Sequence, residues 1–230
     1  MIKNIKHVIK KYDKVICVSK SVLDVLIKQK FDLENGMVCY NPVDSHELIK
    51  YKKEYQIQDK LKICCVGRLE DQKGFDRLIK ILGKLRLKNY VVDIYGTGTM
   101  KDELDDMIRK YGLEEYVHLK GFHKNIYEAM SNYHLLISPS RAEGFSLVVA
   151  EAMCMGIPVL STDCAGPNEL TDYGKYGILV ENSDEALENA IQNIFEKKEA
   201  LYKYHKLSEE RSNIFKIENV MKEVEGNIYE

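Results

Sequence analysis

The sequence lacks the features that mark membrane-spanning, nucleic-acid-binding and metal-dependent proteins. No run of about 18 apolar residues occurs, so no transmembrane helix is expected. The 34 basic and 36 acidic residues nearly cancel, and the net charge of −2 leaves no nucleic-acid footprint. The histidines show no ligand spacing and no Asp-x-Asp sequence occurs, so no metal site is expected. An apolar content of 45% and a charged content of 30% fit a soluble globular protein.

Cys-x-x-Cys pairs and a secretory leader are also absent. The 6 cysteines lie mostly in apolar runs, which predicts reduced core thiols of a cytosolic protein. The first residues, MIKNIKHVIKKYDK, are basic but lack an apolar core and a cleavage site, so they are not a signal peptide. Their alternation of Lys with Ile and Val predicts an amphipathic helix packed on a domain. Contact with the inner face of an anionic membrane is the alternative.

Short apolar runs alternate with helical periods from Lys60 onward, which predicts an α/β, Rossmann-like fold with a doubly wound parallel sheet. The expected strands are 61–66, 91–95, 116–120, 134–138, 157–161 and 177–180. The expected helices lie near 75–86, 99–111, 124–131, 146–155, 167–172 and 183–198. A further strand–helix–strand segment is expected before residue 45, with Ser19 or Ser21 capping its helix.

The segment EGFSLVVAE, from Glu143 to Glu151, carries the strongest functional signal. A strand-like run precedes it and an apolar helical run follows, so the chain turns from a strand into a helix at this point. The first turn of a helix has unpaired N–H groups and a positive dipole end, which makes it an anion site. Ser146 is the expected N-cap. With a carboxylate on either side for hydroxyl groups, the arrangement suits a phosphorylated sugar.

A second anion site follows the expected strand LKICCVG, which ends at Gly67. Arg68 and Lys73 flank the loop between this strand and the next helix. Ligands of open α/β sheets bind at the carboxyl ends of the strands, where this loop would lie. Arginine offers a planar fork to phosphate and lysine a mobile point charge, so the pair favours a diphosphate.

These motifs together resemble the nucleotide-sugar-binding half of the retaining glycosyltransferases of family 4. The resemblance rests on GRLEDQKGFDRLI, YGTGTMKDEL, LKGF and SPSRAEGFSLVVAEAMCMGIPVLSTDCAGPNEL, in that order, and covers about Lys60 to Glu196. It implies the carboxyl-terminal half of a GT-B type two-domain fold. Residues 1–45 would then be the end of an amino-terminal acceptor domain with its linker. Residues 46–206 would form the donor domain, and the helical tail 207–230 would cross back toward the amino-terminal domain.

The resemblance also implies roles for individual residues. Glu143 would hold sugar hydroxyls at the reacting end and Glu151 the ribose hydroxyls, while Arg68 and Lys73 stabilise the diphosphate. The catalytic residues expected are Glu143, Arg68 and Lys73. The substrate-binding residues expected are Glu151, Phe145, Ser146, Leu147, Gly67, Gly96, Gly98, Phe122 and His123. For Gly96 and Gly98 a simple tight turn is an equal alternative, and Phe122 and His123 would line the base pocket.

The implied reaction transfers a hexose or related sugar, with retention, from a nucleoside diphosphate sugar to an acceptor hydroxyl. No cofactor or metal is required, because cationic side chains and a helix N-terminus would stabilise the leaving diphosphate. A UDP-sugar is the favoured donor, and the acceptor, a sugar, lipid-linked or protein hydroxyl, would bind through a missing amino-terminal domain. The alternatives are a truncated, non-catalytic nucleotide-sugar-binding module and, less favoured, a sugar-nucleotide epimerase.

Overall fold

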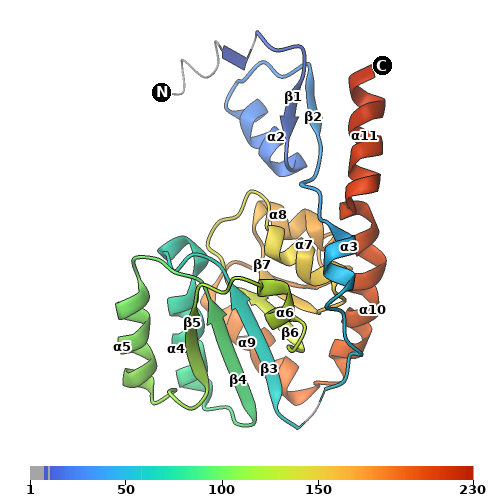
Figure 1. Ribbon diagram of the computed structural model, residues 1–230. Helices are drawn as coiled ribbons and strands as arrows, with labels where there is room; N and C mark the ends of the chain where they lie inside the picture. Colours follow the sequence, from blue (N-terminus) through green and yellow to red (C-terminus); the bar gives the residue numbers. More distant parts are fainter. Residues whose placement is uncertain (1–7, 10, 58, 230) are drawn as a thin grey trace.

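A six-stranded parallel sheet forms the larger part of the molecule, with the strand order β5-β4-β3-β6-β7-β8 (Figure 1). The computed structural model describes residues 8–9, 11–57 and 59–229, with side chains as far as residue 226. The strands of this sheet are β3 (Leu61–Val66), β4 (Tyr90–Tyr95), β5 (Val117–Gly121), β6 (Leu135–Ser138), β7 (Val159–Thr162) and β8 (Ile178–Val180). The doubly wound parallel sheet predicted from the sequence is confirmed, with strand ends shifted by one or two residues.

Helices cover both faces of this sheet. The helices that pack on this sheet are α4 (Phe75–Leu85), α5 (Lys101–Tyr111), α6 (Ile126–Met130), α7 (Leu147–Cys154), α8 (Ala165–Leu170) and α9 (Asp184–Glu196). Because side chains alternate along a strand, Ile63 packs into one core with α4, α5 and α9, whereas Cys64 packs into the other with α6 and α7. Both cores contain side chains that are fully buried.

A second, two-stranded parallel sheet lies apart from the first (Figure 1). It consists of β1 (Val15–Cys17) and β2 (Gly36–Val38), joined by α2 (Lys20–Lys28). Ser19 caps α2 as predicted, since its side chain accepts a hydrogen bond from the N–H of Val22 at 3.1 Å. We refer to residues 15–38 as the amino-terminal unit. The amphipathic helix expected over the first 14 residues falls mostly outside the described residues.

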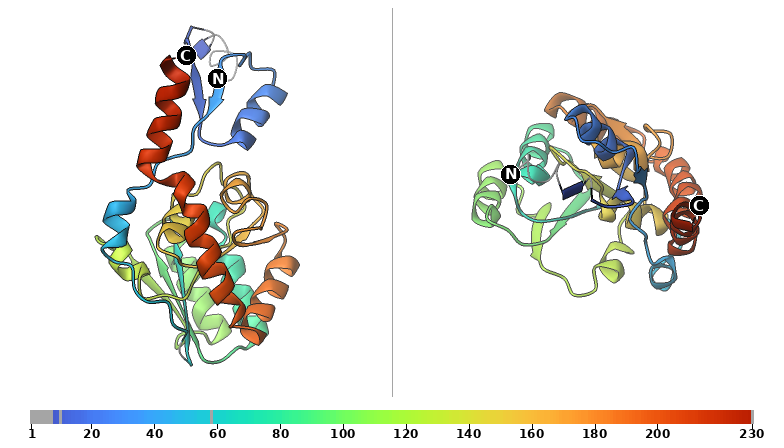
Figure 2. Two further views of the ribbon diagram at one scale, coloured as in Figure 1. Left: turned by 90° about the vertical axis from the view of Figure 1, so that its right-hand side faces the viewer. Right: turned by 90° about the horizontal axis from the view of Figure 1, so that it is seen from above.

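The linker and the tail differ from the prediction. The linker contains an unpredicted short helix, α3 (Ser45–Ile49). The tail forms two helices, α10 (Ala200–Ser212) and α11 (Ile217–Tyr229), separated by a 3-10 turn (Asn213–Phe215), rather than one helical segment from 207. The chain breaks here because fully buried Phe215 inserts into the core and the N–H of Val43 bonds to its carbonyl oxygen at 2.7 Å. Beyond the break, α11 runs alongside the amino-terminal unit (Figure 2).

Candidate functional site

The site lies where the strand order reverses, between β3 and β6. From β3 the chain proceeds outward to β4 and β5, then returns to β6 on the other side of β3. Ligands of open α/β sheets bind in the crevice outside the carboxyl ends of the strands at such a point. The loops that follow β3 and β6 meet there. Gly74 has φ of +68°, and a Cβ at this position would lie 2.1 Å from the carbonyl oxygen of Pro139, so only glycine permits this close approach.

An ion pair joins these two loops. Lys73 of the β3 loop bonds through Nζ to Oε1 of Glu143 in the β6 loop. The hydroxyl of Ser140 donates to the same oxygen at 3.0 Å. The Glu143 side chain is 8% exposed and that of Lys73 is 21% exposed, so the pair is largely shielded from solvent. Two residues that the sequence analysis placed in separate motifs therefore form one cluster.

Arg68 stands at the same edge of the sheet but is exposed. Its guanidinium makes no hydrogen bond or ion pair with any residue that the structure describes. It lines a cavity of about 270 Å³ together with Gly67, Gly96, Phe122 and His123. The structure thus brings five of the predicted site residues around one hollow. The assignment of this hollow to the nucleotide base stays a prediction.

The glycines of the β4 loop have a packing reason. A Cβ on Gly96 would lie 1.8 Å from the carbonyl oxygen of Gly67, and one on Gly98 would lie 2.4 Å from that of Leu69. The two loops are also bonded, with the N–H of Leu69 donating to the oxygen of Thr97 at 2.9 Å. Close approach of backbone to backbone, more than a tight turn, explains why both positions are glycine.

The beginning of α7 has the unpaired donors that an anion site requires. The backbone N–H groups of Phe145, Ser146 and Leu147 find no hydrogen-bond acceptor among the described residues. Ser146 occupies the N-cap position, but its side chain makes no capping hydrogen bond, so the predicted side-chain cap is wrong. The N–H groups that a capping hydroxyl satisfies in other helices are left open here.

Glu151 lies one turn into α7 and is partly enclosed by apolar residues. Burial raises the pKa of its carboxyl group above the usual value, and a hydrogen bond from the hydroxyl of Tyr127 at 2.9 Å partly opposes this shift. A glutamate in an otherwise apolar helix needs a partner, because a buried charge is costly alone. Tyr127 of α6 is that partner, and no sequence spacing pointed to it.

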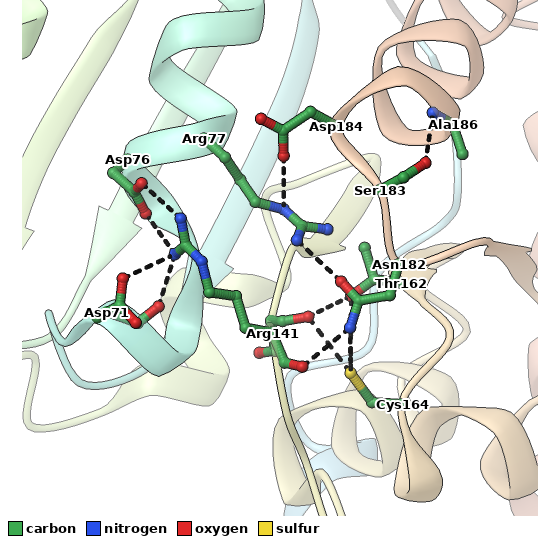
Figure 3. A network of polar contacts seen from close by, with 11 residues as sticks. Asp71, Asp76, Arg77, Arg141, Thr162, Cys164, Asn182, Ser183, Asp184 and Ala186 are labelled. Atoms are coloured by element: carbon green, nitrogen blue, oxygen red, sulfur yellow. Dashed lines mark hydrogen bonds and ion pairs between the residues drawn. The ribbon is translucent and has the colours of Figure 1, made fainter.

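Arg141, for which no role was predicted, joins the loop after β6 to the segment that contains Asp71 and Asp76 (Figure 3). Its guanidinium donates two hydrogen bonds to the carboxylate of Asp76, both at 2.7 Å, and a third to the carbonyl oxygen of Asp71. Burial raises the pKa of Asp76, but the bonds and charge of Arg141 outweigh this and hold it below its usual value. Because Arg141 lies two residues before Glu143, its neighbourhood in the sequence was the available signal.

Glu70 and Gln72, two further residues of the β3 loop, also connect loops. Glu70 accepts hydrogen bonds from the N–H and the hydroxyl of Thr99, at 3.1 and 2.9 Å. The side-chain amide of Gln72 donates to the carbonyl oxygen of Ala142 at 2.7 Å. Contacts between loops are invisible to local pattern reading, since the partners are about 30 and 70 positions away.

In the part of the chain that the structure describes, no three His, Cys, Asp or Glu side chains gather closely enough to hold a metal ion. No helix there is both long and apolar enough to cross a membrane. All six cysteines are buried and unbridged.

The strand order and the position of the site define a doubly wound, Rossmann-like α/β fold. The comparisons with known proteins match this fold to the carboxyl-terminal half of GT-B type retaining glycosyltransferases. Residues 47–211 match the family model described as "Glycosyl transferases group 1", and the chain belongs to this family. The chain spans 48% and 36% of the length of the two curated relatives described next.

Two curated relatives illustrate the similarity. One is the Campylobacter jejuni N-acetylgalactosamine-N,N'-diacetylbacillosaminyl-diphospho-undecaprenol 4-alpha-N-acetylgalactosaminyltransferase, 34% identical over 76% of this chain and 48% of that protein. The other is the Staphylococcus aureus poly(ribitol-phosphate) alpha-N-acetylglucosaminyltransferase, 30% identical over 78% of this chain and 36% of that protein.

Two solved structures have the same fold. A mutant of S. aureus TarM in complex with Fondaparinux, alpha-GlcNAc-glycerol and UDP superposes with a TM-score of 0.84 and 25% identity, over 98% of this chain and 45% of that one. Anabaena HepE in complex with UDP and glucose gives a TM-score of 0.83 at 23% identity, over 94% of this chain and 63% of that one.

Proposed function

We propose that this chain is the donor-binding half of a retaining glycosyltransferase that moves a hexose or related sugar from a UDP-sugar to an acceptor hydroxyl. The observation that carries the proposal is the cluster of residues between β3 and β6, where the strand order reverses. There Lys73 and Glu143 meet across two loops beside the unpaired N–H groups at the start of α7. A nucleotide sugar contains a diphosphate and a sugar in one molecule. Its binding needs a cation and free N–H groups for the phosphates, and a carboxylate close by for the sugar hydroxyls.

The proposed chemistry separates charge during cleavage of the anomeric C–O bond. Negative charge builds on the leaving diphosphate, and Lys73, Arg68 and the N–H groups of 145–147 stabilise it in place of a metal ion. In the structure the ammonium group of Lys73 is paired with Glu143, and on donor binding this ammonium group would bond to phosphate. Glu143 then accepts hydroxyl groups of the sugar, which compensates for the loss of its cation.

Glu151 is proposed to accept the ribose hydroxyls, and the cavity lined by Phe122 and His123 to receive the base. A uridine nucleotide is supported by the UDP named in the TarM complex. Several relatives are named as N-acetylglucosaminyl- or N-acetylgalactosaminyltransferases, so UDP-N-acetylglucosamine is the first donor to test. Two of these names mention undecaprenol and poly(ribitol-phosphate), which supports a role in cell-surface glycoconjugate synthesis at the cytoplasmic face of the membrane.

The test is calorimetric titration of the 230-residue chain with UDP, GDP and UDP-N-acetylglucosamine. Glu151→Ala should weaken all ligands that contain a uridine ribose, whereas Glu143→Ala should affect the complete sugar donor and turnover more than UDP. Glu114→Ala, an exposed glutamate between α5 and β5, is the matched control. Equal losses of UDP affinity in the Glu143 and Glu151 variants would refute this division of roles.

A second candidate is a donor-binding module that does not transfer sugar by itself. It is favoured by the place of the proposed donor contacts, which all lie between residues 68 and 151, at the six-stranded sheet. Acceptor contacts would then come from an amino-terminal half across a cleft, and transfer requires closing that cleft. We expect the chain alone to bind donor without transferring it, and a fusion to the amino-terminal half of a relative to transfer. Efficient transfer by the chain alone would exclude this candidate.

A further inference from the structure

Glu169, in α8, is a buried carboxylate that makes no ion pair with any described residue. It is 5% exposed. Its two oxygens accept hydrogen bonds from the backbone N–H of Lys20 at 2.8 Å and of Ser21 at 2.6 Å, and from the hydroxyl of Tyr40 at 3.3 Å. Every one of these partners lies more than 120 residues earlier in the chain. The side chain therefore serves a long-range contact and not its own helix.

The contact is placed where a carboxylate is most favourable. Lys20 and Ser21 form the first turn of α2, which has unpaired N–H groups and the positive end of the helix dipole. The side chain of Ser19 satisfies the N–H of Val22. Ser19 and Glu169 together thus pair three of the donors at this helix end. A buried carboxylate without such bonds would be costly, so the two elements depend on each other.

This end of α2 also borders the loop that carries Glu143. A Cβ on Gly144 would lie 3.5 Å from Cγ2 of Val22, and the Tyr40 ring centroid is 6.0 Å from that of Phe145. The N–H of Gly166, at the start of α8, bonds to the carbonyl oxygen of Glu143 at 3.0 Å. The short helix α8 therefore contacts both the loop that carries Glu143, which we call the donor loop, and the amino-terminal unit.

Glu169 is also anchored within the larger part of the molecule, whose six-stranded sheet we call the donor sheet because the donor site is proposed at its edge. Arg211 of α10 donates to the carbonyl oxygen of Glu169 at 2.8 Å and to that of Leu170 at 3.0 Å. Its guanidinium also lies over the rings of Tyr176 and Phe215. The carboxylate is thereby held in place while α2 has no residue buried in a core of its own. The linker has separate attachments, through the bridge of Val43 with Lys216, whereas Glu169 bonds to the backbone of α2 itself.

We infer that Glu169 is a positioning residue that fixes the amino-terminal unit over the donor loop and so sets the geometry of the cleft in which transfer takes place. The inference rests on the proposed function for the meaning of the cleft. Glu169 need touch neither donor nor acceptor. It acts through the first turn of α2, which it holds beside the loop that positions Glu143 and the free N–H groups of α7.

The experiment compares Glu169→Ala and Glu169→Gln in the full 230-residue chain. Spin labels at Lys28→Cys in α2 and Lys110→Cys in α5, both exposed, report the distance between the unit and the donor sheet. Hydrogen exchange at the N–H groups of Lys20 and Ser21 reports the contact itself, and UDP titration reports the donor site. Ser19→Ala, which removes only the local cap, is the matched control.

We expect Glu169→Ala to broaden the label distance and to accelerate exchange at Lys20 and Ser21 by at least about tenfold, with exchange in β3 and β4 unchanged. Glu169→Gln should give an intermediate effect, because one amide oxygen replaces two carboxylate oxygens. UDP affinity should stay within about twofold, since only the geometry across the cleft changes. Ser19→Ala should leave the label distance unchanged.

Two results would overturn the inference. One is an unchanged distance distribution in both Glu169 variants. The other is faster exchange throughout the donor sheet, which would make Glu169 an ordinary stabilising residue. Failure of the wild-type chain to bind UDP would refute the proposed donor site instead, and the distance measurement would still decide the role of Glu169. If Glu169→Ala does not fold, Glu169→Gln supplies the same comparison.

Discussion

The donor sheet and the amino-terminal unit are built from the same repeat, parallel strands joined by a helix, but they bury very different amounts of apolar surface. In the donor sheet, β3 has four fully buried apolar residues and α4 buries five apolar residues. In the amino-terminal unit α2 buries none, and Ile16 of β1 is 49% exposed. The difference follows from the number of strands, because helices on both faces of a wide sheet enclose it, whereas two strands cannot enclose one helix.

The two regions obtain their stability from different sources. The donor sheet has two cores of its own and positions its site through contacts inside them. The amino-terminal unit and the linker that follows it rely on attachments to other elements, among them Glu169 to α2, the Tyr40 ring and the bridge between Val43 and Lys216. An element held by a few polar contacts can move relative to a rigid one, which is the arrangement that a closing cleft requires.

The largest difference is expected from the same substitution made in each region. Ile79→Ala, at a fully buried position of α4, should lower the free energy of unfolding by about 2–5 kcal/mol, because it leaves a cavity. Ile27→Ala, at a position of α2 that is 49% exposed, should change it by less than about 0.5 kcal/mol. Urea unfolding measures both. Equal losses would show that α2 is buried in a core after all.

A somewhat smaller effect is expected at the site. Arg68→Ala and Lys73→Ala should each weaken UDP binding by about 1.5–3 kcal/mol, the range for hydrogen bonds to charged groups. Uridine, which has no phosphate, should bind almost unchanged. Calorimetry measures both ligands, with Lys80→Ala on the exposed face of α4 as control. If the double variant retains its UDP affinity, the diphosphate does not bind here.

A smaller, pH-dependent effect is expected at Glu151. Its pKa is raised in the folded protein, so the folded state holds the proton more tightly than the unfolded state does. The resulting stabilisation is complete below 4.5, the ordinary pKa of a glutamate, and is lost as the pH rises through the folded pKa. UDP affinity should change in the opposite sense, because the carboxylate is the better acceptor, and should decline as the pH falls through the same range. Glu151→Gln should abolish both pH dependences. Calorimetry at several pH values measures the UDP affinity, and urea unfolding at the same pH values measures the stability.

The smallest effect is expected from chelation. If cationic side chains and helix N–H groups stabilise the diphosphate, EDTA should change UDP affinity by less than about twofold. Calorimetry with and without EDTA, and then with added magnesium or manganese, tests this. A loss of binding that either metal restores would refute the charge-stabilisation proposal.

Much of the architecture was predictable because the donor sheet follows local rules. Every expected strand and helix from Lys60 to Glu196 is present, since buried parallel strands are apolar runs and their helices are amphipathic. The tail was predicted less well. Its break at Asn213–Phe215 exists because Phe215 reaches a distant core, which no local pattern shows. The short helix α3 escaped prediction because five residues carry too little periodicity.

The sequence alone determined the types of residue available to the site and the strand ends from which they project. Arg68, Lys73, Glu143 and Glu151 are recognisable because their motifs place charge beside a strand end or a helix start. Only the tertiary structure decided which of them meet. The pairing of Lys73 with Glu143, of Tyr127 with Glu151 and of Glu169 with α2 joins segments at least 24 positions apart. Such contacts depend on the strand order and on burial, which raises the energetic cost of an unpaired charge.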